Sequence, residues 1–128
     1  MTPQTKEWVK KAEGDWDVVL LLRRSRKQNR YDAIRFHCQQ CAEKYLKARL
    51  QEAAARFPYT HDLAELLLLL LPIEPSWALF QPELAALTNA AVLFRYPGQW
   101  STPRQAKQAF GIAQRVRSMA RLSLGMKS

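Results

Sequence analysis

The stretch HCQQCAEKYLKA at residues 37–48 holds the side chains that could most readily bind a metal ion or take part in redox chemistry. Cys38 and Cys41 are three residues apart, and His37 lies beside them. A structural zinc site would need two more ligands beside this pair; the chain has no second cysteine pair, and only His37 and His61 are available as histidines. A redox-active CxxC pair normally lies at a helix N-terminus, whereas this pair lies inside a predicted helix, on its apolar stripe. We therefore expect both cysteines to pack in the core, with no metal ion and no cofactor.

A second set of side chains in this stretch could bind anions. His37, Gln40, Lys44 and Lys47 follow one another at spacings of three, four and three residues, so they form one ridge along a helix. One interpretation is a surface that offers ammonium groups to phosphates. The other is a solvent-facing side that keeps the helix soluble, in which Glu43 and Lys47 form an i,i+4 ion pair.

His61 stands where a third helix is predicted to begin, next to Asp62. Free backbone N–H groups and the positive end of the helix dipole attract anions at such a position. Because histidine is the side chain whose charge changes near neutral pH, His61 could act as an acid, a base or a donor to phosphate. The alternative is a residue of the capping region that packs over the Pro58-Tyr59 turn.

Arg95 and Tyr96 precede Pro97 at the expected end of a fourth helix. An arginine in the last turn is common, because it interacts favourably with the helix dipole and the last carbonyl groups. Tyr96 and the nearby Trp100, however, combine aromatic surfaces with a guanidinium group. These are the components of a site that stacks a base and binds its phosphate.

The elements that must position these residues are all predicted to be helices, separated by short, proline-marked breaks. The expected helices run from near Pro3 to the basic residues 23–26, from about Tyr31 to Ala54, from a Thr60 N-cap to Pro72, and from Pro82 to a point before Pro97, with a short helical turn between Pro75 and Pro82. A last helix follows Thr102-Pro103-Arg104-Gln105, which matches a capping box. The pattern predicts an all-α fold, an antiparallel four- to five-helix up-and-down bundle, as one domain over residues 1–128.

The charge of the chain favours an anionic partner. Its formal charge is +9, from 20 Lys and Arg against 11 Asp and Glu, and no acidic residue follows Glu83. The predicted last helix has an apolar side with Ala109, Ile112, Ala113, Val116, Met119 and Ala120, and a basic side with Arg104, Lys107, Arg115, Arg117 and Arg121. This basic side is either a binding face or an ordinary solvated helix surface.

Several classes of protein are not expected from this sequence. It contains no Gly-rich phosphate loop, no GxSxG element and no HExxH motif, so an ordinary metabolic enzyme is disfavoured. The six leucines at 66–71 are far fewer than the roughly 20 apolar residues of a membrane-spanning helix. Since no apolar leader segment is evident, we expect a cytoplasmic protein that does not associate with membranes.

Three segments give the chain its resemblance to a known family: QQCAEKYLKA at residues 39–48, THDL at 60–63 and FRYPG at 94–98. In order and spacing they match the second helix, the start of the third helix and the end of the fourth helix of the HEPN family, named for nucleotide-binding domains of higher eukaryotes and prokaryotes. The likeness spans almost the whole chain. It implies a small all-α bundle, commonly a homodimer, which is frequently encoded beside a minimal nucleotidyltransferase in modules that look like toxin–antitoxin pairs.

The resemblance also implies one of two activities. Many family members are metal-independent ribonucleases with an Arg-x(4–6)-His motif, and others are nucleotide- or RNA-binding modules without it. Here Arg30–His37 and Arg56–His61 have this spacing, but both precede the late position at which catalytic relatives carry the motif. No histidine follows Arg95, so that late position lacks the motif.

Our leading hypothesis is a nucleotide- or RNA-binding bundle that acts with a minimal nucleotidyltransferase in a toxin–antitoxin-like module. The residues expected to bind the nucleotide or RNA are Gln40, Lys44, Lys47, His61, Asp62, Arg95 and Tyr96. One alternative is a metal-independent endoribonuclease, with His61 as acid or base and Arg95 stabilising the phosphate charge. Another is a protein-interaction module whose basic helix docks on an acidic partner.

Overall fold

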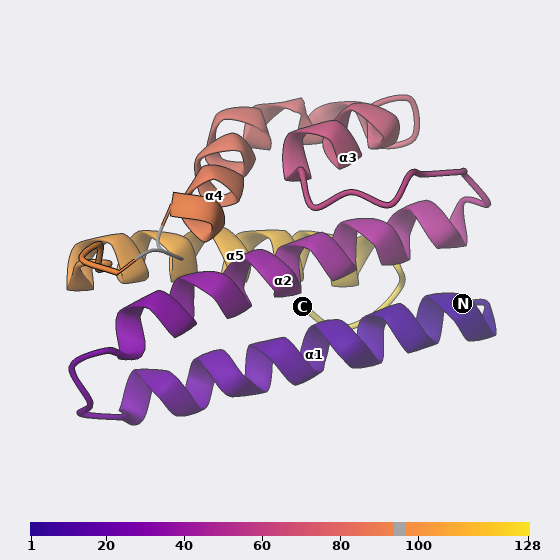
Figure 1. Cartoon of the computed structure of the whole chain (residues 1–128). Helices are drawn as coiled ribbons and strands as arrows, with labels where there is room; N and C mark the ends of the chain where they lie inside the picture. The colour runs from indigo at the N-terminus through magenta and orange to yellow at the C-terminus, as the bar shows by residue number, and fades with distance from the viewer. Residues whose placement is uncertain (94–96) are drawn as a thin grey trace.

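The computed structural model describes the backbone of residues 1–93 and 97–128, and the side chains of all of these except 90–93. The elements are α1 (Pro3–Arg24), α2 (Arg30–Glu52), α3 (Leu63–Leu70), the 3₁₀ helix η1 (Pro75–Phe80), α4 (Gln81–Leu93) and α5 (Pro103–Ser123). No strand occurs in the described ranges, which confirms the predicted all-α class. The chain runs up and down, with α3, η1 and α4 together forming the third leg of the bundle (Figure 1).

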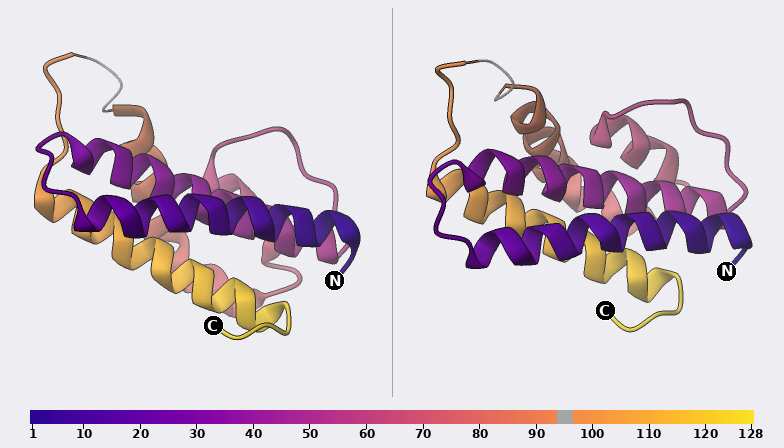
Figure 2. Two further views of the ribbon diagram at one scale, coloured as in Figure 1. Left: turned by 90° about the horizontal axis from the view of Figure 1, so that it is seen from below. Right: turned by 60° about the horizontal axis from the view of Figure 1, so that its bottom comes forward.

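The central element of the fold is α2. It packs against α1, α3, α4 and α5, and Figure 2 shows the two other long helices, α1 and α5, lying along its length. Because neighbours cover most of its circumference, its buried residues include Gln39, Glu43 and Lys47 beside the apolar ones. The helix therefore has no broad solvated side of the kind that an amphipathic surface helix presents.

Local capping explains where α1 begins and how it joins α2. The hydroxyl oxygen of Thr2 accepts a hydrogen bond from the Thr5 N–H group at 3.1 Å, and Pro3 occupies the first turn. Oε1 of Glu52, the last residue of α2, accepts from Thr2 N–H and from Thr5 Oγ1, each at 3.0 Å. The start of α1 is thus attached to the end of α2.

The C-terminal ends of α2 and α5 have the same geometry but different residues at the key position. Ala54 (φ 55°) and Gly125 (φ 79°) both lie in the left-handed region just after their helices. Ala55 N–H donates to Leu50 O and Ala54 N–H to Gln51 O, both at 3.0 Å, which is the Schellman arrangement. Glycine has no Cβ that opposes this conformation, whereas alanine does, so the end of α2 is the strained one.

The start of α3 corrects one prediction. The N-cap is Asp62, which accepts from the N–H groups of Ala64 and Glu65, whereas Thr60 was expected in this role. Thr60 instead accepts from Asp62 N–H at 3.1 Å and donates to Glu65 at 2.9 Å. Both residue types cap helices, and Thr60 here organises the turn that precedes the cap.

The later elements follow the predicted pattern. A short 3₁₀ helix begins at Pro75, and α4 starts at Gln81, one residue before the expected position. The capping box of α5 is present, with Thr102 and Gln105 each bonded to the backbone of the other. The predicted apolar side of α5 is buried apart from Met119, which is partly buried.

Candidate functional site

A buried glutamate organises the first of two polar clusters on α2. The side chain of Glu43 is only 4% exposed, and its carboxylate accepts three hydrogen bonds. The donors are His61 Nδ1 at 2.8 Å, Gln39 Nε2 at 3.2 Å and Lys47 Nζ at 3.1 Å. A buried carboxylate needs such partners, because leaving it unpaired would be costly. We call Gln39, Glu43, Lys47 and His61 the Glu43 cluster.

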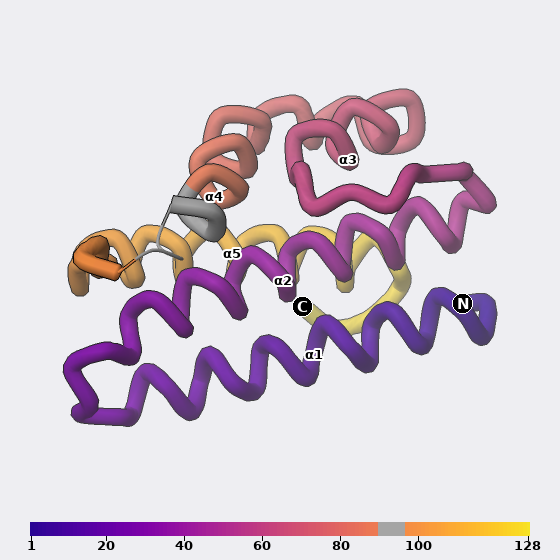
Figure 3. The backbone as a smooth tube through the Cα atoms, in the orientation of Figure 1, coloured from indigo at the N-terminus to yellow at the C-terminus, as the bar shows by residue number. Residues whose placement is uncertain are grey.

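The connector between α2 and α3 runs back along α2 (Figure 3), and His61 near its end contacts Gln39 and Glu43 of that helix. Gln39 Nε2 donates to the backbone oxygen of His61 at 3.0 Å, which fixes the connector at that residue. The ring of Tyr59 meets the imidazole edge to face, with centroids 5.4 Å apart. Asp62 then caps α3, so the residue after His61 is also held. The imidazole is therefore positioned by contacts on both sides of it in the chain.

The pair formed by His61 and Glu43 can support acid–base chemistry. A carboxylate only accepts hydrogen bonds, so the Nδ1 of His61 must carry the proton in this contact. In the neutral imidazole, Nε2 is then the nitrogen with the free lone pair, and it has no hydrogen-bond partner among the described residues. The ring is 57% exposed, so a ligand can approach it. A carboxylate that orients a histidine in this way is a recurring part of acid–base sites.

The position of Lys47 corrects a second prediction. Its side chain is 4% exposed, so the expectation that this end of the ridge faces solvent is wrong. The ammonium group lies 5.5 Å from the ring centroid of Trp8 on α1 and 5.6 Å from that of Tyr59 in the connector. The predicted i,i+4 ion pair with Glu43 is present, but it is buried. The reason is that α1 and the connector cover α2 on this side.

A second cluster joins α1 to α2. Asp15 accepts from His37 Nδ1 at 2.8 Å and from Lys44 Nζ at 2.5 Å, through its two different oxygens. Its side chain is 11% exposed, while those of Lys44 and His37 are 22% and 27% exposed. We call Asp15, His37 and Lys44 the Asp15 cluster. Gln40 lies between these α2 residues and donates to Oε1 of Gln39 at 2.7 Å, so it contacts the Glu43 cluster.

The two clusters have the same charge composition. Each contains one carboxylate, one ammonium group and one imidazole, so each is neutral when its imidazole is neutral and positive when it is protonated. The ammonium groups of Lys44 and Lys47 already bind carboxylates. In each cluster the imidazole and the ammonium group thus share one carboxylate.

The structure brings together part of the predicted site. Lys47 and His61 belong to the Glu43 cluster, Gln40 contacts it, and Lys44 belongs to the Asp15 cluster. Asp62 is adjacent but serves as the N-cap of α3. Arg95 and Tyr96 lie outside the described residues.

Two residues of the clusters were not anticipated from the sequence, Asp15 and Gln39. Asp15 had a signal that could have been used: it falls between Ala12 and Val19 at helical spacing, on the buried side of α1. A carboxylate in such a register needs a partner from a neighbouring helix. Gln39 had no comparable signal, because its burial depends on how α2 is covered.

The cysteines occupy the core, as predicted. Cys38 and Cys41 are both fully buried. Burial raises the pKa of the Cys38 thiol to about 12 and that of Cys41 well above its usual range. Both are therefore protonated at neutral pH, whereas metal binding and redox chemistry use the thiolate. Among the described residues, no group of three or more His, Cys, Asp or Glu side chains is arranged to hold a metal ion.

A further cluster shows that the basic side of α5 is neither wholly solvated nor wholly free for binding. Glu13 accepts from Tyr45 Oη at 2.5 Å and from two nitrogens of Arg117, each at 2.7 Å. Arg121 is also 3.5 Å from this carboxylate. Burial alone would raise the pKa of Glu13, but the bonds from Arg117 and Tyr45 outweigh it and hold the pKa below its usual range. Arg117 and Arg121 thus fasten α5 to α1 and α2.

Comparison with known proteins gives one informative match for this arrangement. A family model described as "HEPN domain" matches residues 5–123, a range that ends at the last residue of α5. No curated protein and no solved structure gives a significant match. None of the described helices has the length and apolar character needed to cross a membrane.

Proposed function

The chain belongs to the HEPN domain family, and we propose that it is a nucleotide- or RNA-binding bundle that works with a minimal nucleotidyltransferase in a toxin–antitoxin-like module. Family membership supports a nucleotide- or RNA-related function in general. The partner and a homodimeric assembly are supported by the resemblance of the segments at 39–48, 60–63 and 94–98. We also propose that residues 1–128 form one domain, because the buried residues of the described helices form one core.

One observation carries the binding proposal: a largely exposed imidazole is held by a buried carboxylate. His61 is the exposed member of the Glu43 cluster, and its Nε2 has no partner among the described residues. When protonated, Nε2 becomes a donor suited to a phosphate oxygen. In this proposal Lys44 neutralises the carboxylate of Asp15 and Lys47 that of Glu43, so that the surface presented to the phosphate is not negative. Arg95 and Tyr96 would add a guanidinium group and a ring for stacking.

Binding of a labelled single-stranded RNA at low salt tests the proposal. We expect His61→Ala to weaken binding more than His37→Ala does, because the His37 side chain is less exposed and belongs to the Asp15 cluster. Equal binding by the unaltered chain and both variants would contradict the assignment of the site to His61. If the unaltered chain binds neither RNA nor nucleotide under conditions in which a known RNA-binding protein does, the function itself is contradicted.

A second candidate function is favoured by the hydrogen bond between His61 and Glu43, which suits catalysis as well as binding. In metal-independent RNA cleavage, Nε2 of His61 would take the proton of a ribose 2′-hydroxyl as its oxygen attacks the adjacent phosphorus and the 5′-oxygen leaves. Arg95 would stabilise the charge that develops on the phosphate. Cleavage of labelled RNA in EDTA that disappears in both His61→Ala and Arg95→Ala supports this function. Cleavage that is unchanged in both contradicts it.

The proposed partner is tested separately. We expect a gene for a small nucleotidyltransferase beside the gene for this chain, and we expect its product to co-purify when the two are expressed together. Co-purification that survives the replacement of Lys44 and Arg95 would favour a protein-interaction module over a nucleotide-binding one. A chain that never associates with the neighbouring product would contradict the module.

A further inference from the structure

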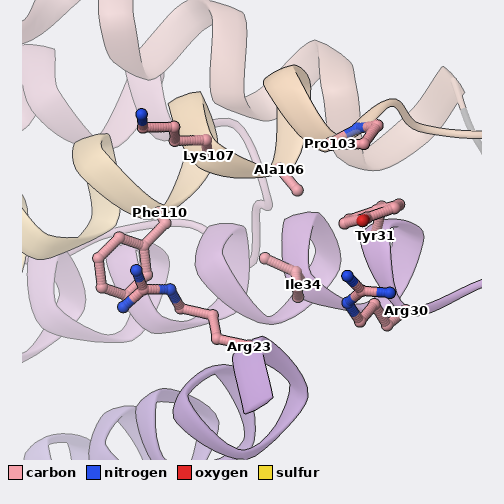
Figure 4. A pocket seen from close by; sticks show the side chains of 8 residues that line it. All are labelled: Arg23, Arg30, Tyr31, Ile34, Pro103, Ala106, Lys107 and Phe110. Atoms are coloured by element: carbon pink, nitrogen blue, oxygen red, sulfur yellow. The ribbon is translucent and has the colours of Figure 1, made fainter. Parts of the chain in front are cut away.

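A pocket of about 230 Å³ lies where α1 ends and where α2 and α5 begin (Figure 4). Three cationic side chains line it, each from a different helix: Arg23 from α1, Arg30 from α2 and Lys107 from α5. Ile34 and Phe110 contribute apolar surface, and no acidic residue is among those that line it. The pocket is therefore positively charged and has an apolar interior wall.

Aromatic rings, rather than carboxylates, hold the two arginines in place. The guanidinium carbon of Arg23 is 3.7 Å from the ring centroid of Phe110, which itself stacks on Trp16. The guanidinium carbon of Arg30 is 4.3 Å from the ring centroid of Tyr31. Nη1 of Arg30 also donates to the backbone oxygen of Lys27 at 2.7 Å, which holds this guanidinium group without neutralising it. Both arginines therefore keep their full charge and their remaining N–H donors for a ligand.

This pocket differs in charge from the clusters on α2. Lys44, Lys47, Arg117 and Arg121 each have a carboxylate partner. Among the described residues, Arg23, Arg30 and Lys107 form no ion pair. The positive charge of the pocket is therefore available to an anion without first displacing an internal carboxylate.

The cations extend beyond the pocket. Arg24, Arg26 and Lys27 are exposed in the last turn of α1 and the connector to α2, and Arg104 is exposed beside Pro103, which lines the pocket. One phosphate does not need so many cations. The volume is also below the roughly 300 Å³ at which pockets begin to enclose whole small ligands. Both features fit a chain of phosphates that crosses the surface better than a single enclosed nucleotide.

We propose that this pocket binds backbone phosphates of single-stranded RNA, with Arg23, Arg30 and Lys107 as the contacting cations. The proposal rests on the proposed function, since it places part of the RNA path at a site separate from His61. Bases next to the bound phosphates can stack on the exposed faces of arginines, as is common in sequence-independent binding. The pocket then supplies electrostatic attraction for the phosphate backbone, and the Glu43 cluster supplies the contact from His61.

The test is the salt dependence of binding to a labelled single-stranded RNA. Each phosphate contact contributes about 0.7 to the slope of log affinity against log salt, so the triple variant Arg23→Gln/Arg30→Gln/Lys107→Gln should lose about 2 units of slope. At about 0.1 M salt this corresponds to roughly 100-fold weaker binding, or about fivefold for each cation. The matched control is Lys6→Gln/Lys10→Gln/Lys11→Gln, which removes three exposed charges from the other end of α1.

The outcomes distinguish failure of the proposed phosphate site from failure of the proposed RNA-binding function. The inference is supported if the pocket variant shows these losses, the control loses much less, and longer oligonucleotides bind more tightly. It is overturned if RNA binds the pocket variant and the control equally well, and the proposed function then still stands. It is also overturned if free nucleotide displaces RNA and affinity does not grow with length, since the pocket would then hold a single nucleotide. If the unaltered chain binds no RNA, both fail.

Because Arg23 packs on Phe110, its replacement could loosen the fold. Arg23→Lys keeps the charge, and the double variant Arg30→Gln/Lys107→Gln leaves Arg23 in place. The double variant should still lose about 1.4 units of slope. Circular dichroism of each variant verifies that the helices are intact. An unchanged slope in a folded double variant overturns the inference.

Discussion

Nδ1 of His61 lies 2.8 Å from Oε1 of Glu43, although the histidine side chain is 57% exposed and that of the glutamate only 4%. This contact connects the surface of the protein to the interior of its central helix. The same carboxylate accepts hydrogen bonds from the buried side chains of Lys47 and Gln39. The imidazole that is proposed to bind a phosphate is therefore held by a carboxylate that also stabilises the interior. Changes at Glu43 should therefore affect stability and function together, whereas changes at His61 should affect mainly function.

The buried pair of Glu43 and Lys47 predicts a strongly non-additive effect on stability. Glu43→Met leaves a buried ammonium group without its carboxylate and should lower the free energy of unfolding by about 3–5 kcal/mol. The double variant Glu43→Met/Lys47→Met removes both charges and should be more stable than Glu43→Met alone. Urea denaturation of the two single variants, the double variant and the unaltered chain measures this coupling. A double variant that is destabilised by the sum of the single effects would show that the pair is not coupled.

The lowered pKa of Glu13 predicts how stability depends on acid. A carboxyl whose pKa is lowered on folding contributes stability that is complete above its ordinary value of 4.5 and is lost as the pH falls through the lowered value. We expect Glu13→Gln to be less stable than the unaltered chain at neutral pH, and the difference to shrink below about pH 4.5. Denaturant titrations at several pH values provide the measurement. A difference that stays constant down to pH 3 would rule out this role for the bonds from Arg117 and Tyr45.

The buried thiols should not react in the folded protein. Cys38 and Cys41 are fully buried, and burial raises the pKa of both thiols. A thiol-specific colorimetric reagent should therefore label neither residue in native buffer, apart from slow labelling through unfolding, and both in concentrated urea. A small free thiol in the same buffers serves as the control. Rapid labelling under native conditions would mean that at least one cysteine is accessible to solvent, and would favour a redox role for that residue.

The strained end of α2 offers a stabilising substitution. Ala54 has a φ of 55°, and Ala54→Gly should raise the free energy of unfolding by up to about 1 kcal/mol, because glycine adopts this conformation without a Cβ clash. The matched control is Gly125→Ala at the equivalent position after α5, which should have the opposite effect. Thermal denaturation of both variants gives the comparison. Destabilisation by Ala54→Gly would indicate that the Ala54 side chain contributes more through contacts than it loses through strain.

The helices themselves could be predicted because their signals are local. The capping box at Thr102 and the prolines at 75, 82 and 103 act through the backbone of nearby residues, so the sequence placed these boundaries within about a residue. The cap of α3 was misplaced because Thr60 and Asp62 are both suitable caps. The choice also depends on tertiary contacts: Leu63 N–H, for example, donates to Thr88 Oγ1 on α4 at 3.0 Å.

The candidate site could be predicted only in part, because burial is a tertiary property. His37, Gln40, Lys44 and Lys47 do form a line along α2, as their spacing indicates. Whether that line faces water depends on how many elements pack around α2, which helical periodicity does not specify. Asp15 was not predicted as a site residue, although its position on the apolar stripe of α1 is a usable signal. A carboxylate in such a position indicates a buried partner even before that partner is known.

The most direct test of the account is an NMR titration that follows the imidazole signals as RNA is added. The chain has two histidines, so there are two sets of signals, and His61→Ala assigns them. We predict that the ¹³C and ¹⁵N signals of His61 shift in a saturable way on addition of single-stranded RNA. The midpoint of this shift should equal the midpoint of RNA binding measured by fluorescence anisotropy. Signals of His61 that do not move while RNA is demonstrably bound would contradict the account, because the exposed imidazole above Glu43 would then not be the contact.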